Sequence, residues 1–325
     1  MPCPTSPRRR PRLAAALIAL LSVPGSIHAQ PQPARGFADP LLGRWDLTIH
    51  APDGPYPSWL EVRLRTETEL MGRFVGRFGS VRHATAVRYE GGRVEFVVPV
   101  QYERRTDPLR FYGALQDDTL SGTASDENGN TLRWTGARAP ALPAASAPVW
   151  GTPVALFNGR DLSGWGPRSG AADDCWQVVG GELVATPPCV DLISEPGFDD
   201  FKLHVELNFP KGANSGIYLR GRYEVQIQDD AGKALDPLRM GGVYGFLAPS
   251  TDAARPAGEW QTLEVTLLGR RVTVSLNGTT IIDGQDIPGI TGGALDSHES
   301  APGPIMLQGN HDPIRFRRIT LTPRL

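Results

Sequence analysis

Short alternating stretches of polar and apolar residues, separated by turn residues, recur along this chain from residue 40 onward. Such alternation places successive side chains on opposite faces of a strand. Residues 201–209 alternate without interruption, and residues 265–278 contain two such stretches joined by a tight turn. Helical periodicity of useful length is absent, and 37 Gly and 30 Pro residues among 325 favour turns. The sequence therefore predicts an all-β protein.

The strand patterns fall into two groups, which predict two domains. Residues 40–138 contain about eight short strand patterns, which is typical of a small antiparallel β-barrel or barrel-like domain. Residues 154–325 contain about thirteen, one of them at residues 242–246, and these predict two packed antiparallel sheets in a jelly-roll sandwich. The Ala- and Pro-rich residues 139–153 between them predict a semi-extended linker.

The N-terminus has the pattern of a targeting segment. Four arginines, at positions 8, 9, 10 and 12, precede an apolar run at residues 13–23, which is too short to span a bilayer. We therefore predict a signal peptide at residues 1–29, export to the periplasm or the extracellular space, and no membrane span. The chain has 33 basic and 35 acidic residues, and removal of these four arginines makes the excess of acidic residues larger. No basic patch suited to nucleic acid is left.

Two cysteines, Cys175 and Cys189, remain once this segment is removed. They flank Trp176 and a Gly-Gly turn, in a compartment that permits disulfides. A bridge between them would contribute about 3 kcal/mol to the free energy of unfolding in the loop-entropy model. With no histidine nearby they would make a poor zinc site, so the spacing favours a structural role.

A row of polar residues distinguishes the strand pattern at residues 223–228. Glu224, Gln226 and Gln228 share one strand face, and Val225 and Ile227 share the other. Amides and carboxylates both orient hydroxyl groups, so this row suits a polyhydroxylated ligand. The alternative is an ordinary sheet face that is covered by water.

Ten short sequence blocks follow one another over about 170 residues of the second domain. They are Leu156-Phe-Asn-Gly-Arg-Asp-Leu-Ser-Gly-Trp165, Trp176-Gln-Val-Val-Gly-Gly-Glu-Leu183, Asp200-Phe-Lys-Leu203, Asn214-Ser-Gly-Ile-Tyr-Leu-Arg220, Tyr223-Glu-Val-Gln-Ile-Gln-Asp229, Gly242-Val-Tyr-Gly245, Gly258-Glu-Trp-Gln261, Leu276-Asn-Gly278, Gly303-Pro-Ile-Met-Leu-Gln308 and Phe316-Arg-Arg-Ile319. Through these blocks the second domain resembles the 3-keto-disaccharide hydrolase domain family. Arg318 is a departure from the family, which more often has Asn there.

This resemblance implies a concanavalin-like jelly roll and the cleavage of glycosides whose sugar carries a ketone at C3. It also implies an oligosaccharide or glycoside substrate and an upstream sugar 3-dehydrogenase that supplies the ketone. The ketone acidifies the proton on C2, so a base could remove it, the C1–O bond could break by β-elimination, and water could add back. Such a route needs a base near C2, a donor or cation at O3 and an acid for the departing oxygen.

Four residues are candidates for these catalytic roles. Glu224 is the first candidate for the base or acid, and Asp229, at the end of the same strand, is the second carboxylate. Arg220 is a candidate for stabilising the enolate, and His311 in a polar loop is a candidate acid or base. The alternatives are an ion pair for Glu224 and Arg220, a turn-forming role for Asp229 and a surface position for His311.

The remaining candidates would bind the substrate. Side chains that could hydrogen-bond to a sugar are Asn214, Ser215, Gln226, Gln228 and Gln308. Rings that could stack on it, unless they belong to the core, are Tyr218, Tyr244 and Trp260. Glu259, beside Trp260, is either an acid in the cleft or a structural carboxylate. Residues 291–304 have no strand pattern and are a candidate lid.

We expect neither a cofactor nor a catalytic metal, since no ligand spacing typical of one is present. Structural Ca²⁺ at Asp229–Asp230 or at residues 296–299 stays open. Two other functions also stay open: a lectin-like protein that binds carbohydrate without cleaving it, and a conventional glucanase. The glucanase is the less favoured of these, because sandwich glucanases place Glu-x-Asp-x-Glu where this chain has Glu224-Val-Gln-Ile-Gln, with one acidic residue instead of three.

Overall fold

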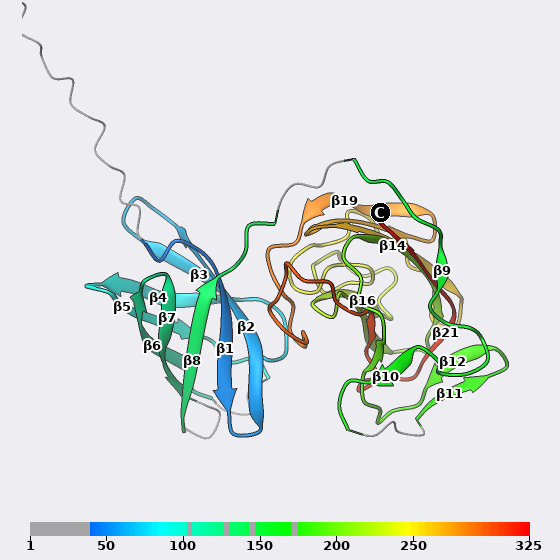
Figure 1. The fold of residues 1–325 in the computed structure, drawn as a ribbon, viewed down its shortest axis with the longest axis horizontal. Helices are drawn as coiled ribbons and strands as arrows, with labels where there is room; N and C mark the ends of the chain where they lie inside the picture. The colour runs from blue at the N-terminus through cyan, green and yellow to red at the C-terminus, as the bar shows by residue number, and fades with distance from the viewer. Residues whose placement is uncertain (1–39, 103–105, 126–129, 143–146, 171–174) are drawn as a thin grey trace, which may run out of the picture. The chain divides into compact units, whose positions relative to one another are not determined.

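The strands of residues 43–138 close on themselves into a barrel (Figure 1). A computed structural model describes residues 40–102, 106–125, 130–142, 147–170 and 175–325. The barrel strands are β1 (Gly43–Ala51), β2 (Gly54–Leu64), β3 (Leu70–Val75), β4 (Arg82–Glu90), β5 (Arg93–Val98), β6 (Leu109–Gln116), β7 (Thr119–Ser125) and β8 (Thr131–Arg138). Neighbouring strands are antiparallel, and β1 pairs with β8. The predicted small antiparallel barrel is confirmed.

Alternating side chains fill the inside of this barrel. On β1, Trp45, Leu47 and Ile49 are buried, and polar residues alternate with them. The rings of Phe96 and Phe111 stack with their centroids 4.4 Å apart. The barrel therefore has an aromatic core of its own.

The second half of the chain forms two antiparallel sheets. Its strands are β9 (Val154–Ala155), β10 (Trp165–Pro167), β11 (Trp176–Val179), β12 (Glu182–Ala185), β13 (Leu192–Ser194), β14 (Phe201–Asn208), β15 (Asn214–Leu219), β16 (Tyr223–Gln228), β17 (Gln261–Leu268), β18 (Arg271–Leu276), β19 (Thr279–Asp286), β20 (Met306–Leu307) and β21 (Ile314–Pro323). The shorter sheet has the order β10-β13-β20-β15-β16. The longer one runs β11-β12-β21-β14-β17-β18-β19, with β9 paired to β21.

The two sheets pack face to face around one apolar core, which confirms the jelly-roll prediction. The longer sheet contributes Leu203 and Val205 of β14, and the shorter one contributes Ile217 of β15 and Val225 of β16. In Figure 1, β14, β19 and β21 curve around the side on which β16 lies. The other face of the shorter sheet is thus left for the polar residues of β15 and β16.

Two elements differ from the pattern in the sequence. A strand is predicted at residues 242–246, but these residues form only isolated bridges, from Val243 to Val225 and Leu247. Gly241 and Gly245 have φ values of 78° and 75°, outside the range of an extended strand. Strand β10 was not predicted, because two of its three residues, Gly166 and Pro167, are of types that strands disfavour.

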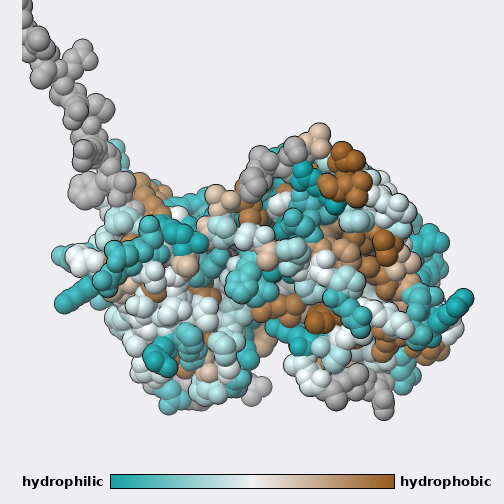
Figure 2. Space-filling view, viewed as in Figure 1, coloured by the Kyte–Doolittle hydropathy of each residue, from teal (hydrophilic) through white to brown (hydrophobic). Residues whose placement is uncertain are grey.

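Hydrophilic residues cover most of the face seen in Figure 2, and hydrophobic ones form small groups among them. Among the described residues, no helix has both the length and the apolar character needed to cross a membrane. The predicted signal peptide lies outside the described residues, as do residues 143–146 of the predicted linker. Trp150, near the end of that linker, makes an isolated bridge to Arg324.

Candidate active site

The polar face of the β15–β16 hairpin is the starting point of the site. Register sets Gly216 opposite Gln226, and Tyr218 opposite Glu224. On the reverse face, Val225 and Ile227 are fully buried in the core. Because the apolar face is fixed in this way, the predicted row of Glu224, Gln226 and the neighbouring Gln228 must point to the other side of the sheet.

Glu224 is a buried carboxyl group, with an exposed fraction of 4%. The Tyr218 hydroxyl lies 3.0 Å from its Oε2 atom and 2.9 Å from the carbonyl oxygen of Gly292. Burial raises the pKa of Glu224 to about 8, the hydrogen bond from Tyr218 opposes this rise, and the negative charge of Asp191 adds to it. The hydroxyl has one proton for two acceptors, so it can turn to Glu224 when this group is ionised and to Gly292 when it is protonated.

Gly216 provides the space in which the Glu224 side chain lies. A Cβ atom at position 216 would be 2.8 Å from Cγ of Glu224 and 3.0 Å from its carboxyl carbon, closer than ordinary contact allows. The small residue thus lets the carboxyl group lie across the neighbouring strand, within reach of Tyr218. A glycine inside a strand often marks a place where another group comes close, and Gly216 stands in the middle of the otherwise regular β15.

Amide side chains extend the site along the sheet. Nε2 of Gln226 donates to Oδ1 of Asn214 at 3.3 Å and to Oε1 of Gln228 at 2.9 Å. Two buried acceptors, Oε1 of Gln226 and Oε1 of Gln308, have no hydrogen-bond partner among the described residues. A buried acceptor without a partner costs free energy, and a hydroxyl donor on a ligand would remove that cost. These two oxygens therefore point to a hydroxylated ligand.

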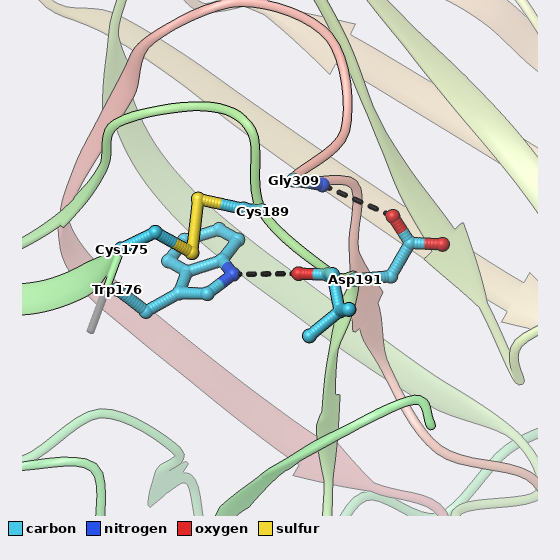
Figure 3. Close-up of a disulfide and its surroundings, with 6 residues drawn as sticks. Cys175, Trp176, Cys189, Asp191 and Gly309 are labelled. Atoms are coloured by element: carbon cyan, nitrogen blue, oxygen red, sulfur yellow. Dashed lines mark hydrogen bonds between the residues drawn. A yellow bond between two sulfur atoms is a disulfide. The ribbon is translucent and has the colours of Figure 1, made fainter. Parts of the chain in front are cut away.

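Asp191 and Arg168 were missed in the sequence, although both belong to this face. Nη1 of Arg168 lies 3.0 Å from Oδ2 of Asp191, and the Gly309 amide donates to Oδ1 at 3.1 Å. Figure 3 shows the Asp191 carboxylate turned toward Gly309 and away from the disulfide that joins Cys175 to Cys189. The signal that could have found Asp191 is a lone acidic residue in the otherwise apolar run at residues 190–193.

A cavity of about 340 Å³ opens beside this ion pair. Arg168, Asp191, Leu295 and Asn310 form one part of its wall. Tyr56 and Phe78 of the barrel form another part. Residues 39–325 belong to one compact unit, so the cavity lies within it. A volume of this size is in the range of small-ligand sites.

Residues 291–296, the covering segment, contact both Glu224 and the cavity. Oγ1 of Thr291 accepts from the Glu224 amide at 2.9 Å, and Gly292 accepts from Tyr218. Arg168 donates to the carbonyl oxygens of Gly293 and Ala294 at 2.9 and 3.2 Å. The first part of the predicted lid therefore contacts the Glu224 backbone, the Tyr218 hydroxyl and Arg168.

Arg220 is placed away from Glu224. It occupies the turn between β15 and β16 with a φ of 52°, and its exposed fraction is 1%. Its guanidinium lies 3.3 Å from Oδ1 of Asp199, donates to the Glu299 carbonyl oxygen at 3.2 Å and also donates to that of Gly269. These contacts give Arg220 a structural environment, and Arg168 is the arginine that lies by the cavity.

Asp229, Ser215 and His311 also lie apart from the Glu224 carboxyl group. Oδ2 of Asp229 accepts from the Gly212 amide at 2.7 Å, in the connection that precedes β15. Ser215 points to the core side of its strand and donates to the Gln308 carbonyl oxygen at 3.0 Å. His311 is exposed in the loop between β20 and β21.

The aromatic candidates lie in different places, Tyr218 and Tyr244 next to Glu224 and Trp260 beside β21. Tyr218 contacts Glu224 directly, and the Tyr244 amide donates to the Glu224 carbonyl oxygen at 3.0 Å. Burial and a hydrogen bond with Tyr102 raise the pKa of Tyr244. Trp260 instead stacks under Arg317 of β21, whose Cζ is 4.2 Å from the ring, and Glu259 beside it is exposed.

The two acidic stretches considered for calcium contain arginine ion pairs. Oδ2 of Asp230 lies 3.8 Å from Arg239, and Oδ1 of Asp296 lies 2.6 Å from Arg222. Within the described part of the chain, no group of three or more His, Cys, Asp or Glu side chains is arranged as metal ligands would be.

Two further carboxyl groups act on each other electrostatically, the half-buried Asp46 of β1 and the buried Glu299. Burial and the mutual repulsion of the two groups raise the pKa of Asp46 to about 8. Burial raises the pKa of Glu299 to about 7, although the hydrogen bond from Tyr223 and the charges of nearby arginines lower it. Tyr223 donates to Oε1 of Glu299 at 2.8 Å. Both groups, like Glu224, are easier to ionise in the unfolded chain.

We predict that the protein loses stability as the pH rises from about 5 to 8. A carboxyl group whose pKa is raised by folding stabilises fully below its unfolded pKa, and this contribution is lost as the pH rises through the folded value. Each group that is protonated in the folded state but ionised in the unfolded state lowers the free energy of unfolding by up to roughly 1.4 kcal/mol per pH unit. Urea unfolding at pH 5 and pH 8 measures the slope. Glu299→Gln should flatten it, and an equal slope in this variant would contradict the assignment.

A family model described as the 3-keto-alpha-glucoside-1,2-lyase-like domain matches residues 152–322. No curated protein matches the chain. Similar solved structures include two proteins of Parabacteroides distasonis that are described as candidate glycosyl hydrolases. The first is 27% identical with a TM-score of 0.46, and the match covers 56% of this chain and 92% of the Parabacteroides chain. The second is 24% identical with a TM-score of 0.43, and the match covers 53% of this chain and 98% of the Parabacteroides chain.

A carbohydrate-binding module of Bacillus subtilis is more distant, with 15% identity, a TM-score of 0.34 and coverage of 49% of this chain and 94% of its own. The family match confirms the resemblance carried by the sequence blocks and supports an enzyme that acts on carbohydrates. Since the family model matches more than half of its length, the chain belongs to the 3-keto-alpha-glucoside-1,2-lyase-like domain family.

Proposed function

We propose that this protein cleaves glycosides of 3-keto sugars, and that Glu224 removes the proton from C2. The observation that carries the proposal is a buried carboxyl group with a pKa of about 8, beside amide oxygens that lack partners. A base whose pKa lies near the working pH removes a carbon-bound proton better than an ordinary carboxylate does. Family membership supports the substrate class.

The bonds change in a balanced sequence. The C2 proton passes to Glu224, the electron pair forms the enolate of the C3 ketone, and the C1–O bond then breaks to give a C1=C2 double bond. The departing oxygen takes a proton and leaves as the alcohol. Water adds at C1, and a proton returns to C2, so the net reaction is hydrolysis. Arg168 is our candidate for stabilising negative charge at O3, because it lies at the cavity beside Asp191.

Access to Glu224 depends on the covering segment. Glu224 is buried, its amide and its partner Tyr218 hydrogen-bond to Thr291 and Gly292, and the cavity lies at Ala294 and Leu295 of the same segment. We propose that these residues shift when the sugar enters, so that its hydroxyl groups reach Gln226 and Gln308. The sugar hydroxyls would then satisfy the two amide oxygens.

The pH dependence of turnover follows from the protonation of Glu224. We predict that kcat/KM rises with pH to a midpoint near 8, because only the ionised carboxylate accepts the C2 proton. Tyr218→Phe removes a hydrogen bond that lowers this pKa, so its midpoint should move to higher pH. Rate profiles between pH 6 and 10 test both statements. A wild-type profile that falls across this range would show that Glu224 acts in its protonated form instead.

A conventional glycosidase is the second candidate, favoured by one observation. Asp191 is a second carboxylate whose charge acts on Glu224, and two carboxyl groups are what ordinary glycoside hydrolysis requires. The deciding experiment compares a 3-keto-glycoside with its unoxidised parent at equal concentration. We expect turnover of the ketone alone. Cleavage of the parent at a similar rate would favour the conventional enzyme, and binding of both without cleavage would favour a lectin-like protein.

The location of the protein and the source of its substrate are two further proposals. We propose that the protein is exported, on the basis of the arginine-rich and apolar residues 1–29. Mass spectrometry of the processed protein should find an N-terminus near Gln30. We also propose that an enzyme oxidising C3 of the sugar supplies the substrate, since the ketone must exist before C2 becomes acidic.

A further inference from the structure

The barrel has a cavity of its own, with a volume of about 380 Å³, at one end. The ends of β1, β3 and β7 and the beginnings of β2, β6 and β8 meet there. Its deeper wall is apolar and consists of Ile49, Phe74, Leu109, Phe111, Ala124 and Leu132. Eight-stranded barrels have an interior that side chains can fill or that can hold one small ligand.

The cavity occupies only part of the barrel interior. Trp45, Leu60 and Trp134 belong to the barrel core but do not line the cavity. At the cavity, the small Ala124 of β7 is paired with Phe111 of the neighbouring β6, and its short side chain leaves the space unfilled. The packing of the barrel therefore provides a pocket of small-ligand size with an apolar wall.

Aromatic rings stand at the rim of the pocket. Phe78 has an exposed fraction of 54% and Tyr102 one of 61%, although both are large apolar rings. Cζ of Arg77 lies 5.2 Å from the ring centre of Tyr56 and 5.5 Å from that of Phe78, and its Nη1 lies 2.6 Å from Oδ2 of Asp53. An apolar wall with an aromatic rim suits a flat aromatic molecule, and the charged pair suits a polar substituent on it.

The rim also belongs to the cavity at Asp191. Tyr56, Arg77 and Phe78 line both cavities. The covering segment is attached to the same rim, because the Gly293 amide donates to the Arg77 carbonyl oxygen at 2.8 Å. A molecule in contact with Asp191 and Arg168 at one end can thus touch the barrel rim at the other.

We propose that the barrel mouth binds the aglycone of the glycoside, and that this aglycone is a flat aromatic group of about two rings. The inference rests on the proposed function, which places the sugar at Arg168, Asp191 and Glu224. It gives the barrel a task in substrate selection: the sugar determines where the bond breaks, and the barrel determines which glycosides are preferred.

The test compares 2-naphthyl and methyl 3-keto-glucosides in the full chain. Ala124→Met fills the pocket, and Phe78→Ala removes a rim ring that is half exposed and so leaves the fold intact. The ratio of kcat/KM for the naphthyl over the methyl glycoside should fall about tenfold in each variant. Comparing ratios between variants cancels the difference between the two leaving groups. Tyr112→Ala removes an aromatic ring of similar exposure, 48%, outside the pocket and should keep the wild-type ratio.

A binding measurement separates this inference from the proposed reaction. Calorimetric titration with 2-naphthol should show binding to the wild type that is weakened about tenfold in Ala124→Met. If neither glycoside is cleaved, the proposed reaction fails, and the titration alone decides the role of the barrel. Absence of 2-naphthol binding to the wild type, or a naphthyl-to-methyl ratio unchanged in both pocket variants, would overturn the inference.

Discussion

Glu224→Gln should lower kcat for a 3-keto-glycoside by about 10²–10⁴-fold, the contribution expected of a positioned general base. Glutamine has nearly the same shape, so it can keep the contact with Tyr218 above Gly216. It cannot accept the C2 proton. Because burial already keeps Glu224 largely protonated at neutral pH, the neutral amide should be tolerated by the fold. Steady-state kinetics, with unfolding measured in parallel, separate the two effects.

The matched control for this variant is Glu264→Gln. Glu264 lies on the outward face of β17 in the other sheet, with 58% of its side chain exposed, and its Oε1 is 3.6 Å from His204. The same change of charge there should leave kcat within about twofold, as is usual for surface substitutions. A Glu224→Gln enzyme that retains wild-type kcat would remove this residue from the mechanism.

Gly216→Ala is the second large effect, expected to lower kcat about 10²-fold. The new methyl group would stand 2.8 Å from Cγ of Glu224, so the carboxyl group must move along the sheet. A displacement of about 1 Å in a catalytic group is enough for a loss of this size. Kinetics and the pH profile should change together, since a displaced Glu224 also loses its contact with Tyr218.

Gly166→Ala provides the comparison for Gly216→Ala. Gly166 belongs to β10 of the same sheet, and a Cβ atom there would have no neighbour within 4 Å. The same substitution should therefore leave kcat unchanged at this second position. Equal losses at both positions would mean that the sheet as a whole, rather than the space for Glu224, sets the rate.

Local alternation explains why most of the fold could be predicted. The apolar residues of β14 fall on one side of the strand, and this requires no knowledge of distant residues. The same reasoning placed Glu224, Gln226 and Gln228 on one face before their partners were known. It failed at residues 242–246, where glycines with positive φ interrupt a pattern that resembles a strand.

Contacts between distant residues explain what the sequence did not reveal. Asp191 lies 33 positions before Glu224, and only the pairing of β13 with β20 and of β20 with β15 brings both to one sheet face. Arg220 is adjacent to the polar row in sequence, yet its turn directs the guanidinium to Asp199 and Glu299 instead. The arginine chosen for its closeness to the polar row in the sequence is therefore not the one beside the cavity.

The central claim is that Glu224 removes the proton from C2, and deuterium tests it most directly. A 3-keto-glycoside is cleaved in D₂O at an early time point, and the C2 position of the released sugar is examined by mass spectrometry and NMR. Free 3-keto-glucose kept under the same conditions measures exchange without the enzyme. Our account predicts deuterium at C2 well above this control, together with loss of the reaction in Glu224→Gln. Sugar released with hydrogen retained at C2 would contradict it.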